Sequence, residues 1–222
     1  MKINNIDKKE VIRYLGIKGE VEELDLICKC MEECRELVDY RVAYREYTIE
    51  ENEVGLEIKD TNKNLLGISI KKYLKGCYKV ILIGVTLGYE VEKAIKRYGK
   101  VDLLKALVLD ACSTAAIEGV CDEIENSIDE KVKANKEFTR GRFSPGYGDF
   151  PIEFQKDFLE LVDASRTIGL NVTESNILIP RKSVTAIIGV SKFKNNKNIR
   201  SCEQCGFYNK CNYRKGGKKC YD

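Results

Sequence analysis

Residues 142–147 read Arg-Phe-Ser-Pro-Gly-Tyr, a segment whose side chains could bind a small polar ligand. The guanidinium of Arg142 can hold a carboxylate through two parallel hydrogen bonds, which a lysine ammonium cannot do. Pro145 and Gly146 predict a turn in which backbone can approach a ligand closely, and Tyr147 offers a flat ring and a hydroxyl. These residue types suit a zwitterionic ligand that carries an aromatic base. The alternative is a surface turn with an incidental arginine, because short motifs match by chance.

A second polar segment, Thr173-Glu174-Ser175, precedes Pro180 and Ser183-Val184. Short hydroxyl and carboxylate side chains of this kind are typical of the start of a strand, where they hydrogen-bond the local backbone. We therefore expect Thr173, Glu174 and Ser175 to shape the floor of the pocket rather than to react.

Glu118 is the third candidate, and it lies in a predicted helix over residues 102–127. At about 100° per residue it falls on the stripe of that helix formed by Leu104, Leu107, Val108, Ala111 and Ala115. A carboxylate on such a stripe needs a partner. Either Glu118 faces a ligand, or it is a helix-end glutamate paired with a nearby lysine, since the stripe becomes polar from Asp122 onward.

The two motifs in this order, Arg-x-x-x-Gly-Tyr and Thr-Glu-Ser-x-x-x-x-Pro-x-x-Ser-Val, resemble the activation domain of cobalamin-dependent methionine synthase. The resemblance covers residues 78–191 and implies a site for S-adenosylmethionine. For this ligand we expect Arg142 to bind the carboxylate, and Tyr147 to stack on the adenine or to donate a hydrogen bond. The resemblance also implies that Glu118 approaches the amino group or the sulfonium.

In this family, S-adenosylmethionine is presented to an oxidised cob(II)alamin while a flavodoxin or ferredoxin supplies one electron, which restores methylcobalamin. The resemblance therefore implies a reactivation subunit of a methyltransferase in methionine biosynthesis, with no acid, base or nucleophile of its own. The chain has no histidine and cannot ligate cobalt through an imidazole. Cobalamin would have to be held by a separate methionine synthase subunit. An activator of another corrinoid methyltransferase system is the alternative.

The sequence departs from the family pattern at both ends. Residues 1–60 match no part of it, so the acidic ligand contact near the start of the family's domain has no counterpart here. A tyrosine expected shortly after the last strand is also absent, because Ser191-Lys192-Phe193-Lys194 stands there. Binding of the adenosyl ligand would thus depend on fewer residues than in the family.

Residues 192–222 differ in composition from the rest of the chain and predict a small, basic, Cys-rich C-terminal module. Four cysteines, Cys202, Cys205, Cys211 and Cys220, are enough for a zinc site or an iron-sulfur cluster. The alternatives are a tail that binds no metal, or a nucleic-acid-binding module that uses aromatic residues among its lysines and arginines. We regard nucleic acid as the less favoured partner, although the net charge of +3 by itself argues neither for it nor against it.

Apolar periodicity predicts helices over residues 7–15, 20–38, 65–74, 90–98, 102–127 and 152–167, and strands over residues 40–50, 54–58, 78–85, 175–178 and 184–190. Helices and hairpins are mixed rather than arranged as repeated βα units. The pattern therefore predicts an α+β domain over residues 1–191, with a mainly antiparallel twisted sheet and flanking helices. Residues 129–136 are expected to form a charged linker.

The remaining composition bears on location and on the other cysteines. The longest apolar run, residues 80–87, is too short to span a bilayer, and the N-terminal residues have no apolar signal segment. We therefore expect a soluble, cytoplasmic protein with reduced thiols. Six further cysteines are expected to act as small core hydrophobes: Cys28, Cys30, Cys34, Cys77, Cys112 and Cys121.

Overall fold

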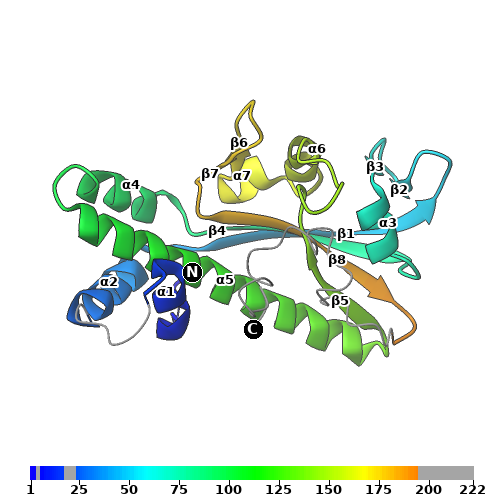
Figure 1. Cartoon of the computed structure of the whole chain (residues 1–222). Coiled ribbons are helices and arrows are strands. Elements are labelled where there is room, and N and C mark those ends of the chain that lie inside the picture. The colour runs from blue at the N-terminus through cyan, green and yellow to red at the C-terminus, as the bar shows by residue number, and fades with distance from the viewer. Residues whose placement is uncertain (4–5, 18–23, 195–222) are drawn as a thin grey trace.

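The computed structural model describes residues 1–3, 6–17 and 24–194. A six-stranded antiparallel sheet, in the order β3-β2-β1-β4-β8-β5, separates two layers of helices (Figure 1). Its strands are β1 (Arg41–Glu51), β2 (Leu56–Ile58), β3 (Asn64–Leu65), β4 (Lys79–Thr86), β5 (Phe138–Phe143) and β8 (Ser183–Ser191). The predicted α+β class, with an antiparallel sheet and flanking helices, is confirmed.

The central strands β4 and β8 pair over their whole length, from Lys79 opposite Val190 to Thr86 opposite Ser183. Both are rich in β-branched residues, and β4 is buried at every position after Lys79. A strand buried on both faces shows a continuous apolar run instead of an alternating pattern. This is why residues 78–85 gave the clearest strand signal in the sequence.

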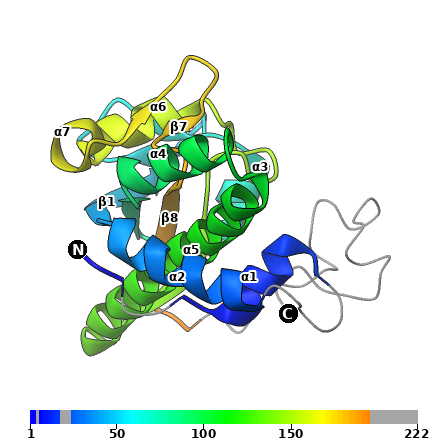
Figure 2. The ribbon, with the colours of Figure 1, turned by 90° about the vertical axis from the view of Figure 1, so that its left-hand side faces the viewer.

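One layer contains four helices that share a core: α1 (Lys8–Leu15), α2 (Leu24–Leu37), α4 (Tyr89–Tyr98) and α5 (Leu103–Ala134). In Figure 1, α1, α2 and most of α5 lie below the sheet, and α4 lies beyond its left-hand end. The other layer contains α3 (Ile68–Tyr73), α6 (Phe154–Leu161), α7 (Ala164–Ile168) and a two-stranded hairpin of β6 (Asn171–Val172) and β7 (Leu178–Ile179). Figure 2 shows the sheet between these layers from one end. We call the two sides of the sheet the lower and the upper face.

Alternate residues of the central strands divide the core between the two faces. Ile81 and Ile83 pack on the lower face with the end of α5, whereas Leu82 and Ile187 pack on the upper face with α6 and α7. Thr185, also on the upper face, donates a hydrogen bond to the side chain of Gln155 in α6 at 2.7 Å. The period-two alternation of a strand thus decides which helix each residue meets.

Helix α5 is longer than the sequence predicted, because residues 129–134 continue it. Asp102 caps its start by accepting a hydrogen bond from the backbone N–H of Lys105 at 3.0 Å. Near its end, Asp129 and Lys133 form an ion pair along the helix, and Val132 is buried against the sheet. The prediction of a charged linker over residues 129–136 was therefore wrong, since these charges occupy the exposed side of a helix whose apolar side meets the sheet.

Two further differences concern the upper layer. The helix predicted over residues 152–167 is interrupted at Asp163, whose φ of +52° is left-handed and cannot continue an α-helix. The helix predicted over residues 65–74 begins only at Ile68, because Leu65 pairs with Leu56 in the sheet. The first boundary is thus set by the backbone conformation of Asp163, and the second by strand pairing.

The start of α5 is partly exposed, contrary to the expected apolar stripe. Leu104 and Leu107 are 51% and 55% exposed, whereas Val108, Ala111 and Ala115 are buried.

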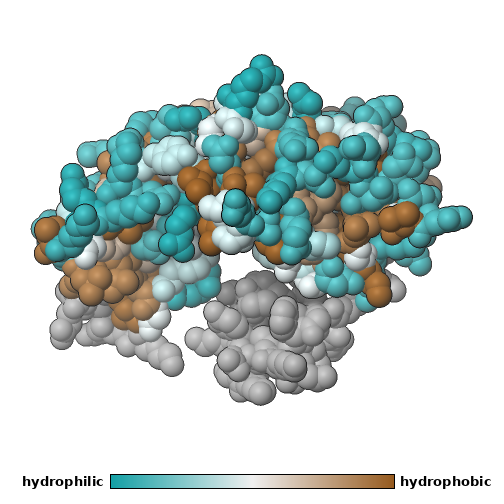
Figure 3. Space-filling view, turned by 90° about the horizontal axis from the view of Figure 1, so that it is seen from above, coloured by the Kyte–Doolittle hydropathy of each residue, from teal (hydrophilic) through white to brown (hydrophobic). Residues whose placement is uncertain are grey.

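The upper surface in Figure 3 is mostly hydrophilic, and its apolar side chains form separate groups. Within the described ranges, no helix is both long and apolar enough to cross a membrane.

Candidate functional site

A β-bulge in the edge strand β5 directs Arg142 toward the lower face. Thr139 pairs with Val190 and Arg142 pairs with Ile188, so three steps along β5 correspond to two steps along β8. In a regular strand, Arg142 would share a face with Arg140, two residues before it. The extra residue instead places Arg142 beside α5, on the same face as Ile188.

Three carboxylates of α5 surround the guanidinium of Arg142. Its Nη2 donates to Asp122 Oδ1 at 2.7 Å and lies 3.4 Å from Glu118 Oε2, and its Nε lies 3.3 Å from Glu125 Oε2. Positions 118, 122 and 125 are spaced by four and three residues, so their side chains project from one side of the helix. Glu118 and Arg142, each predicted as a ligand contact, therefore meet in the folded chain.

The guanidinium is largely buried, with 15% of the Arg142 side chain exposed. Burial alone would lower the pKa of Arg142, but the electrostatic effect of Cys121 and of the carboxylates of Glu125, Asp122 and Glu118 outweighs it and raises the pKa. Its Nη1 is buried and has no hydrogen-bond partner among the described residues. Arg142 is therefore permanently charged and retains a donor group for one further acceptor.

The loop that follows β5 is held by its own backbone. Tyr147 N donates to Ser144 O at 3.1 Å, Gly146 N donates to Phe150 O at 2.9 Å, and Phe150 N donates to Tyr147 O at 3.0 Å. Gly146 has a φ of +89°, which a side-chain-bearing residue adopts only with strain. The turn predicted at Pro145 and Gly146 is present and is closed by hydrogen bonds.

The same loop is fixed to the start of α3. Asp149 accepts hydrogen bonds from the backbone N–H groups of Ser69 at 2.7 Å and Ile68 at 2.8 Å. These two hydrogen bonds lower the pKa of Asp149. Gly148 lies so close to α3 that a Cβ there would come within 2.4 Å of Ser69 Oγ. The loop is therefore preorganised before any ligand binds.

Tyr147 presents its ring at the surface of this loop and is 56% exposed. It meets Phe143 edge to face, with ring centroids 5.6 Å apart, and Phe143 lies 4.7 Å from the ring of Tyr73. Aromatic packing therefore fixes one edge of the Tyr147 ring and leaves more than half of the side chain accessible. Such a ring can stack on a planar base.

Thr173, Glu174 and Ser175 lie in the turn between β6 and β7, a hairpin on the upper side of the sheet (Figure 1). Thr173 Oγ1 is 2.9 Å from Ser175 Oγ and accepts a hydrogen bond from the backbone N–H of Ile177 at 3.0 Å. These hydroxyls hold the turn closed, as expected for local side-chain-to-backbone bonds. Their predicted place in the pocket floor stays a prediction.

Asp122 and Glu125 were missed as site residues in the sequence. Their spacing could have indicated them, because both lie on the same side of the helix as Glu118. The sequence becomes polar at Asp122, however, and this favoured the interpretation of a solvated helix end. In the structure the helix continues for several turns beyond Glu118. Glu118, 47% exposed, lies well inside α5 and 3.4 Å from Arg142, so its expected place at the end of a helix was wrong.

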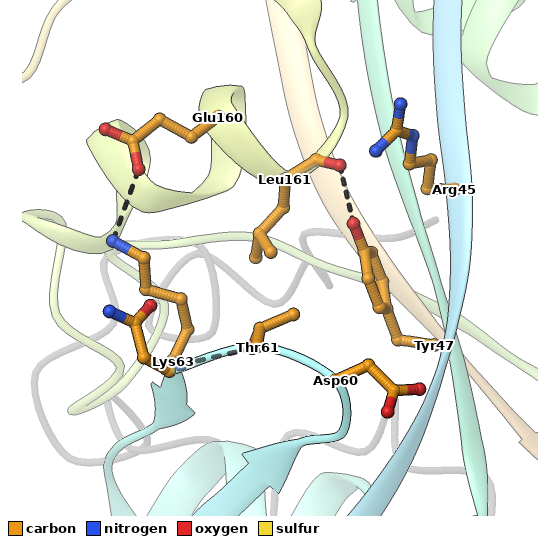
Figure 4. A pocket seen from close by; sticks show the side chains of 8 residues that line it. Arg45, Tyr47, Asp60, Thr61, Lys63, Glu160 and Leu161 are labelled. Atoms are coloured by element: carbon orange, nitrogen blue, oxygen red, sulfur yellow. Dashed lines mark hydrogen bonds and ion pairs between the residues drawn. The ribbon is translucent and has the colours of Figure 1, made fainter.

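Two hollows lie elsewhere on the described surface. One, of about 350 Å³, lies between β1, the turn after β2 and the end of α6 (Figure 4), and none of the predicted site residues lines it. There Tyr47 donates its hydroxyl proton to Leu161 O, and Lys63 pairs with Asp157 and Glu160. The other, of about 530 Å³, lies between β1 and the opposite flank of α5.

The predicted metal ligands Cys202, Cys205, Cys211 and Cys220 lie outside the described residues. Within the described ranges, no group of cysteine and acidic side chains could hold a metal ion. The core role expected for the other cysteines is confirmed for the four that are fully buried: Cys30, Cys34, Cys112 and Cys121. It was wrong for Cys28, which is exposed, whereas Cys77 is partly buried.

The described residues thus form an α+β domain, in which one long helix, α5, lies below an antiparallel sheet. A rigid loop follows the edge strand β5. The chain is similar to the crystal structure of the MetH reactivation domain bound to AdoHcy, with a TM-score of 0.59 and 14% sequence identity. The match covers 96% of this chain and 82% of that one, so the resemblance expected from the motifs is confirmed at the level of the fold. No protein-family model and no curated protein matches the sequence.

Proposed function

We propose that this chain is an S-adenosylmethionine-binding reactivation subunit, which supports reductive methylation of cob(II)alamin on a separate cobalamin-dependent methionine synthase. A flavodoxin or a ferredoxin would supply the electron. The observation that carries the proposal is the meeting of Arg142 and Glu118 at the edge of a sheet whose fold is that of a domain solved with AdoHcy bound.

The residues at this edge fit such a ligand. Arg142 has a donor nitrogen without a protein acceptor among the described residues, so its guanidinium can take a further carboxylate. Glu118 and Asp122 are 47% and 65% exposed, and their carboxylates can accept hydrogen bonds from an ammonium group. Tyr147 adds an accessible ring on a loop that is already ordered.

The work assigned to the chain is positioning. When bound, S-adenosylmethionine supplies a methyl group that its sulfonium already activates, so the cofactor carries the chemistry. Arg142 would fix the amino-acid end of the ligand and Tyr147 its base, while the loop of residues 144–149 limits their motion. A chain without histidine suits this role, because positioning requires no acid, base or nucleophile.

Ligand binding is tested by calorimetric titration of the wild-type protein and the Arg142→Ala variant with S-adenosylmethionine. We expect the variant to bind about 30-fold more weakly, because it loses charge-assisted hydrogen bonds to the carboxylate. Arg166→Ala is the matched control, since Arg166 is 81% exposed and pairs only locally with Asp163. Absence of binding by the wild-type protein, or equal binding by Arg142→Ala, would contradict the proposal.

Reactivation is tested separately. A methionine synthase that lacks its own reactivation domain is loaded with cob(II)alamin and supplied with reduced flavodoxin and S-adenosylmethionine. Addition of this chain is expected to convert the cob(II)alamin spectrum to that of methylcobalamin, and Arg142→Ala is expected not to. Conversion at the same rate with and without the chain would exclude this role while leaving ligand binding intact.

We further propose that the C-terminal cysteines hold zinc or an iron-sulfur cluster. The support is their number and spacing in the sequence, since Cys202 and Cys205 form a Cys-x-x-Cys pair. Metal analysis of anaerobically purified protein, compared with the Cys202→Ser/Cys205→Ser double variant, decides the matter. Bound iron with a visible absorbance band indicates a cluster, and colourless protein with bound zinc indicates a zinc site. Equal metal content in both proteins would refute the assignment.

A further inference from the structure

The hollow of about 350 Å³ on the upper face has the size of a small-molecule site and shares no residue with the Arg142 site. We call it the Tyr47 hollow (Figure 4). It is lined by Arg45 and Tyr47 of β1, by residues 60–63 of the turn after β2, and by Glu160 and Leu161 at the end of α6. The three elements come from distant parts of the chain, so tertiary structure alone creates the hollow.

Two cross-links to α6 hold the walls of the Tyr47 hollow in place. Tyr47 donates its hydroxyl proton to Leu161 O at 2.7 Å, which joins β1 to α6 and fixes the aromatic ring. Lys63 is bound by Asp157 and, at 3.2 Å, by Glu160, which joins the turn to α6. The hollow is therefore preorganised, and the charges of Lys63 and its partners are already satisfied.

The turn after β2 carries an unpaired carboxylate on a closed backbone. Thr61 Oγ1 donates to Ile58 O at 2.7 Å and accepts a hydrogen bond from the backbone N–H of Lys63 at 3.1 Å. Asp60 lies inside this turn, is exposed, and makes no hydrogen bond or ion pair with the described residues. Its carboxylate can thus accept hydrogen bonds from a cationic ligand group.

Arg45 is the corresponding unpaired cation. It is exposed and likewise makes no hydrogen bond or ion pair with the described residues. Its charge acts on Asp163, but that carboxylate is already bound by Arg166 Nε at 2.9 Å. Because Arg45 precedes Tyr47 by two residues on one strand, both side chains lie on the same face of the sheet. The guanidinium can take a carboxylate next to the ring.

The two unpaired charges lie at different positions along β1. The backbone N–H of Lys59 donates to Thr48 O at 2.9 Å, which places the next residue, Asp60, beside residues 47–48. Arg45 lies two to three residues before them, an offset of roughly 7–10 Å at about 3.3 Å per residue. Figure 4 shows the Tyr47 ring between Arg45 and Asp60. The hollow thus offers a cation, an apolar surface and an anion in sequence.

We infer that the Tyr47 hollow binds a short peptide of two or three residues that has unblocked termini and an aromatic side chain. Arg45 binds its carboxylate, Asp60 binds its ammonium group, and the ring of Tyr47 packs on the side chain. An extended chain of two or three residues spans about 7–10 Å, which matches the offset of the two charges. A single amino acid carries both charges on one carbon atom and cannot reach both ends.

The test is calorimetric titration of the whole chain with the tripeptide Gly-Phe-Gly. We expect Arg45→Gln and Asp60→Asn each to bind it about tenfold more weakly than the wild-type protein, because each loses a charge-assisted contact. Both side chains are exposed, so the variants should keep the fold. The matched controls Arg97→Gln and Glu130→Gln remove exposed charges from α4 and α5 and should bind like the wild-type protein.

Blocked peptides assign each residue to one end of the ligand. Acetylation of the N-terminus removes the ammonium group, and amidation of the C-terminus removes the carboxylate. Each should weaken binding to the wild-type protein about tenfold. Acetylation should cost Asp60→Asn nothing further, and amidation should cost Arg45→Gln nothing further. Equal sensitivity of both variants to both modifications would overturn the assignment.

Two further titrations distinguish the peptide from other ligands. L-phenylalanine should bind at least about tenfold more weakly than the tripeptide, since it can use only one of the two charges. Equal affinity would overturn the peptide as the ligand in favour of an amino acid. Saturating S-adenosylmethionine should leave the affinity for the tripeptide unchanged, and displacement of the tripeptide would overturn a separate site.

The inference stands or falls independently of the proposed function. If the wild-type protein does not bind the tripeptide, or if the Arg45 and Asp60 variants bind it equally well, the inference is overturned. None of these outcomes depends on whether Arg142 binds S-adenosylmethionine, because the titrations with peptides contain none of it.

Discussion

Arg140 and Arg142 lie two positions apart on β5, yet they meet different kinds of partner on opposite faces of the sheet. Arg140 is 8% exposed and donates hydrogen bonds to the backbone carbonyl of Lys75 and, at 3.1 Å, to Cys77 Sγ. Arg142 lies on the lower face beside three carboxylates of α5. The bulge between Thr139 and Arg142 separates the two environments.

The two arginines differ in how easily water or a ligand can replace their interactions with their partners. Two partners of Arg140 are a backbone carbonyl and a partly buried thiol, which both belong to the fold. Two of the carboxylates around Arg142 are about half exposed or more, so water can solvate them once the guanidinium turns to a ligand. We therefore expect Arg140 to serve stability, whereas Arg142 is the residue proposed to bind the ligand.

The comparison fails if Arg140 can be removed at little cost. We expect Arg140→Ala to lower the free energy of unfolding by about 3 kcal/mol, because it removes charged hydrogen bonds and leaves a cavity beside Leu74 and Cys77. Urea unfolding followed by circular dichroism measures this. A loss below about 1 kcal/mol would show that the buried guanidinium is not an anchor of the upper face.

The loop on the upper side of β5 gives the next largest effect. Gly148→Ala places a methyl group 2.4 Å from Ser69 Oγ at a residue with a φ of +58°, and we expect a loss of about 2 kcal/mol in the free energy of unfolding. Gly16→Ala is the control, because Gly16 has a φ of +69° but open space around it, and its loss should be about 1 kcal/mol. Equal losses in the two variants would mean that the loop is not tightly fixed to α3.

The sequence predicted the parts of the fold that local pattern determines. Residues 78–85 form a strand buried on both faces and therefore gave an uninterrupted apolar signal, and the first half of α5 gave a clear helical period. The end of α5 was missed because its charges outnumber its apolar residues, although Ile128 and Val132 keep the helical spacing. Strands of two residues, such as β6 and β7, exist only through tertiary pairing and carry no signal of their own.

The residue types of the site were predictable from the sequence, but the face of the sheet on which Arg142 lies was not. Arg142 and Glu118 were singled out from their chemistry and their helical position, and they meet in the structure. The bulge that directs Arg142 toward α5 depends on pairing with Val190 and Ile188, which are far along the chain, so no local pattern of β5 shows it. Asp122 could be identified as a partner of Arg142 only from the position of β5 relative to α5 in the structure.

Replacing Arg142 on the lower face should cost much less stability than replacing Arg140 on the upper face. We expect Arg142→Met to change the free energy of unfolding by no more than about 1 kcal/mol, because its long apolar chain keeps the packing and the carboxylates of Glu118 and Asp122 reach water. The same urea titration measures it. A loss as large as that of Arg140→Ala would place Arg142 among the structural residues and remove the distinction between the two faces.

The smallest expected effect is that of pH on the loop anchor Asp149. Hydrogen bonds from the backbone N–H groups of Ser69 and Ile68 hold the pKa of Asp149 below its ordinary value of 3.8 in the folded state. A carboxyl group with a lower pKa when folded stabilises the protein at neutral pH, and this contribution is lost as the pH falls from the unfolded value through the folded pKa. The melting temperature of the wild-type protein should therefore exceed that of Asp149→Asn by a constant amount between about pH 7 and pH 5, and the two should converge below about pH 4.

Glu130→Gln, which removes an exposed carboxylate outside the loop, should show no such convergence. If the difference for Asp149→Asn stayed unchanged in acid, the loop would be held by shape alone, and the upper side of β5 would be rigid without any contribution from charge.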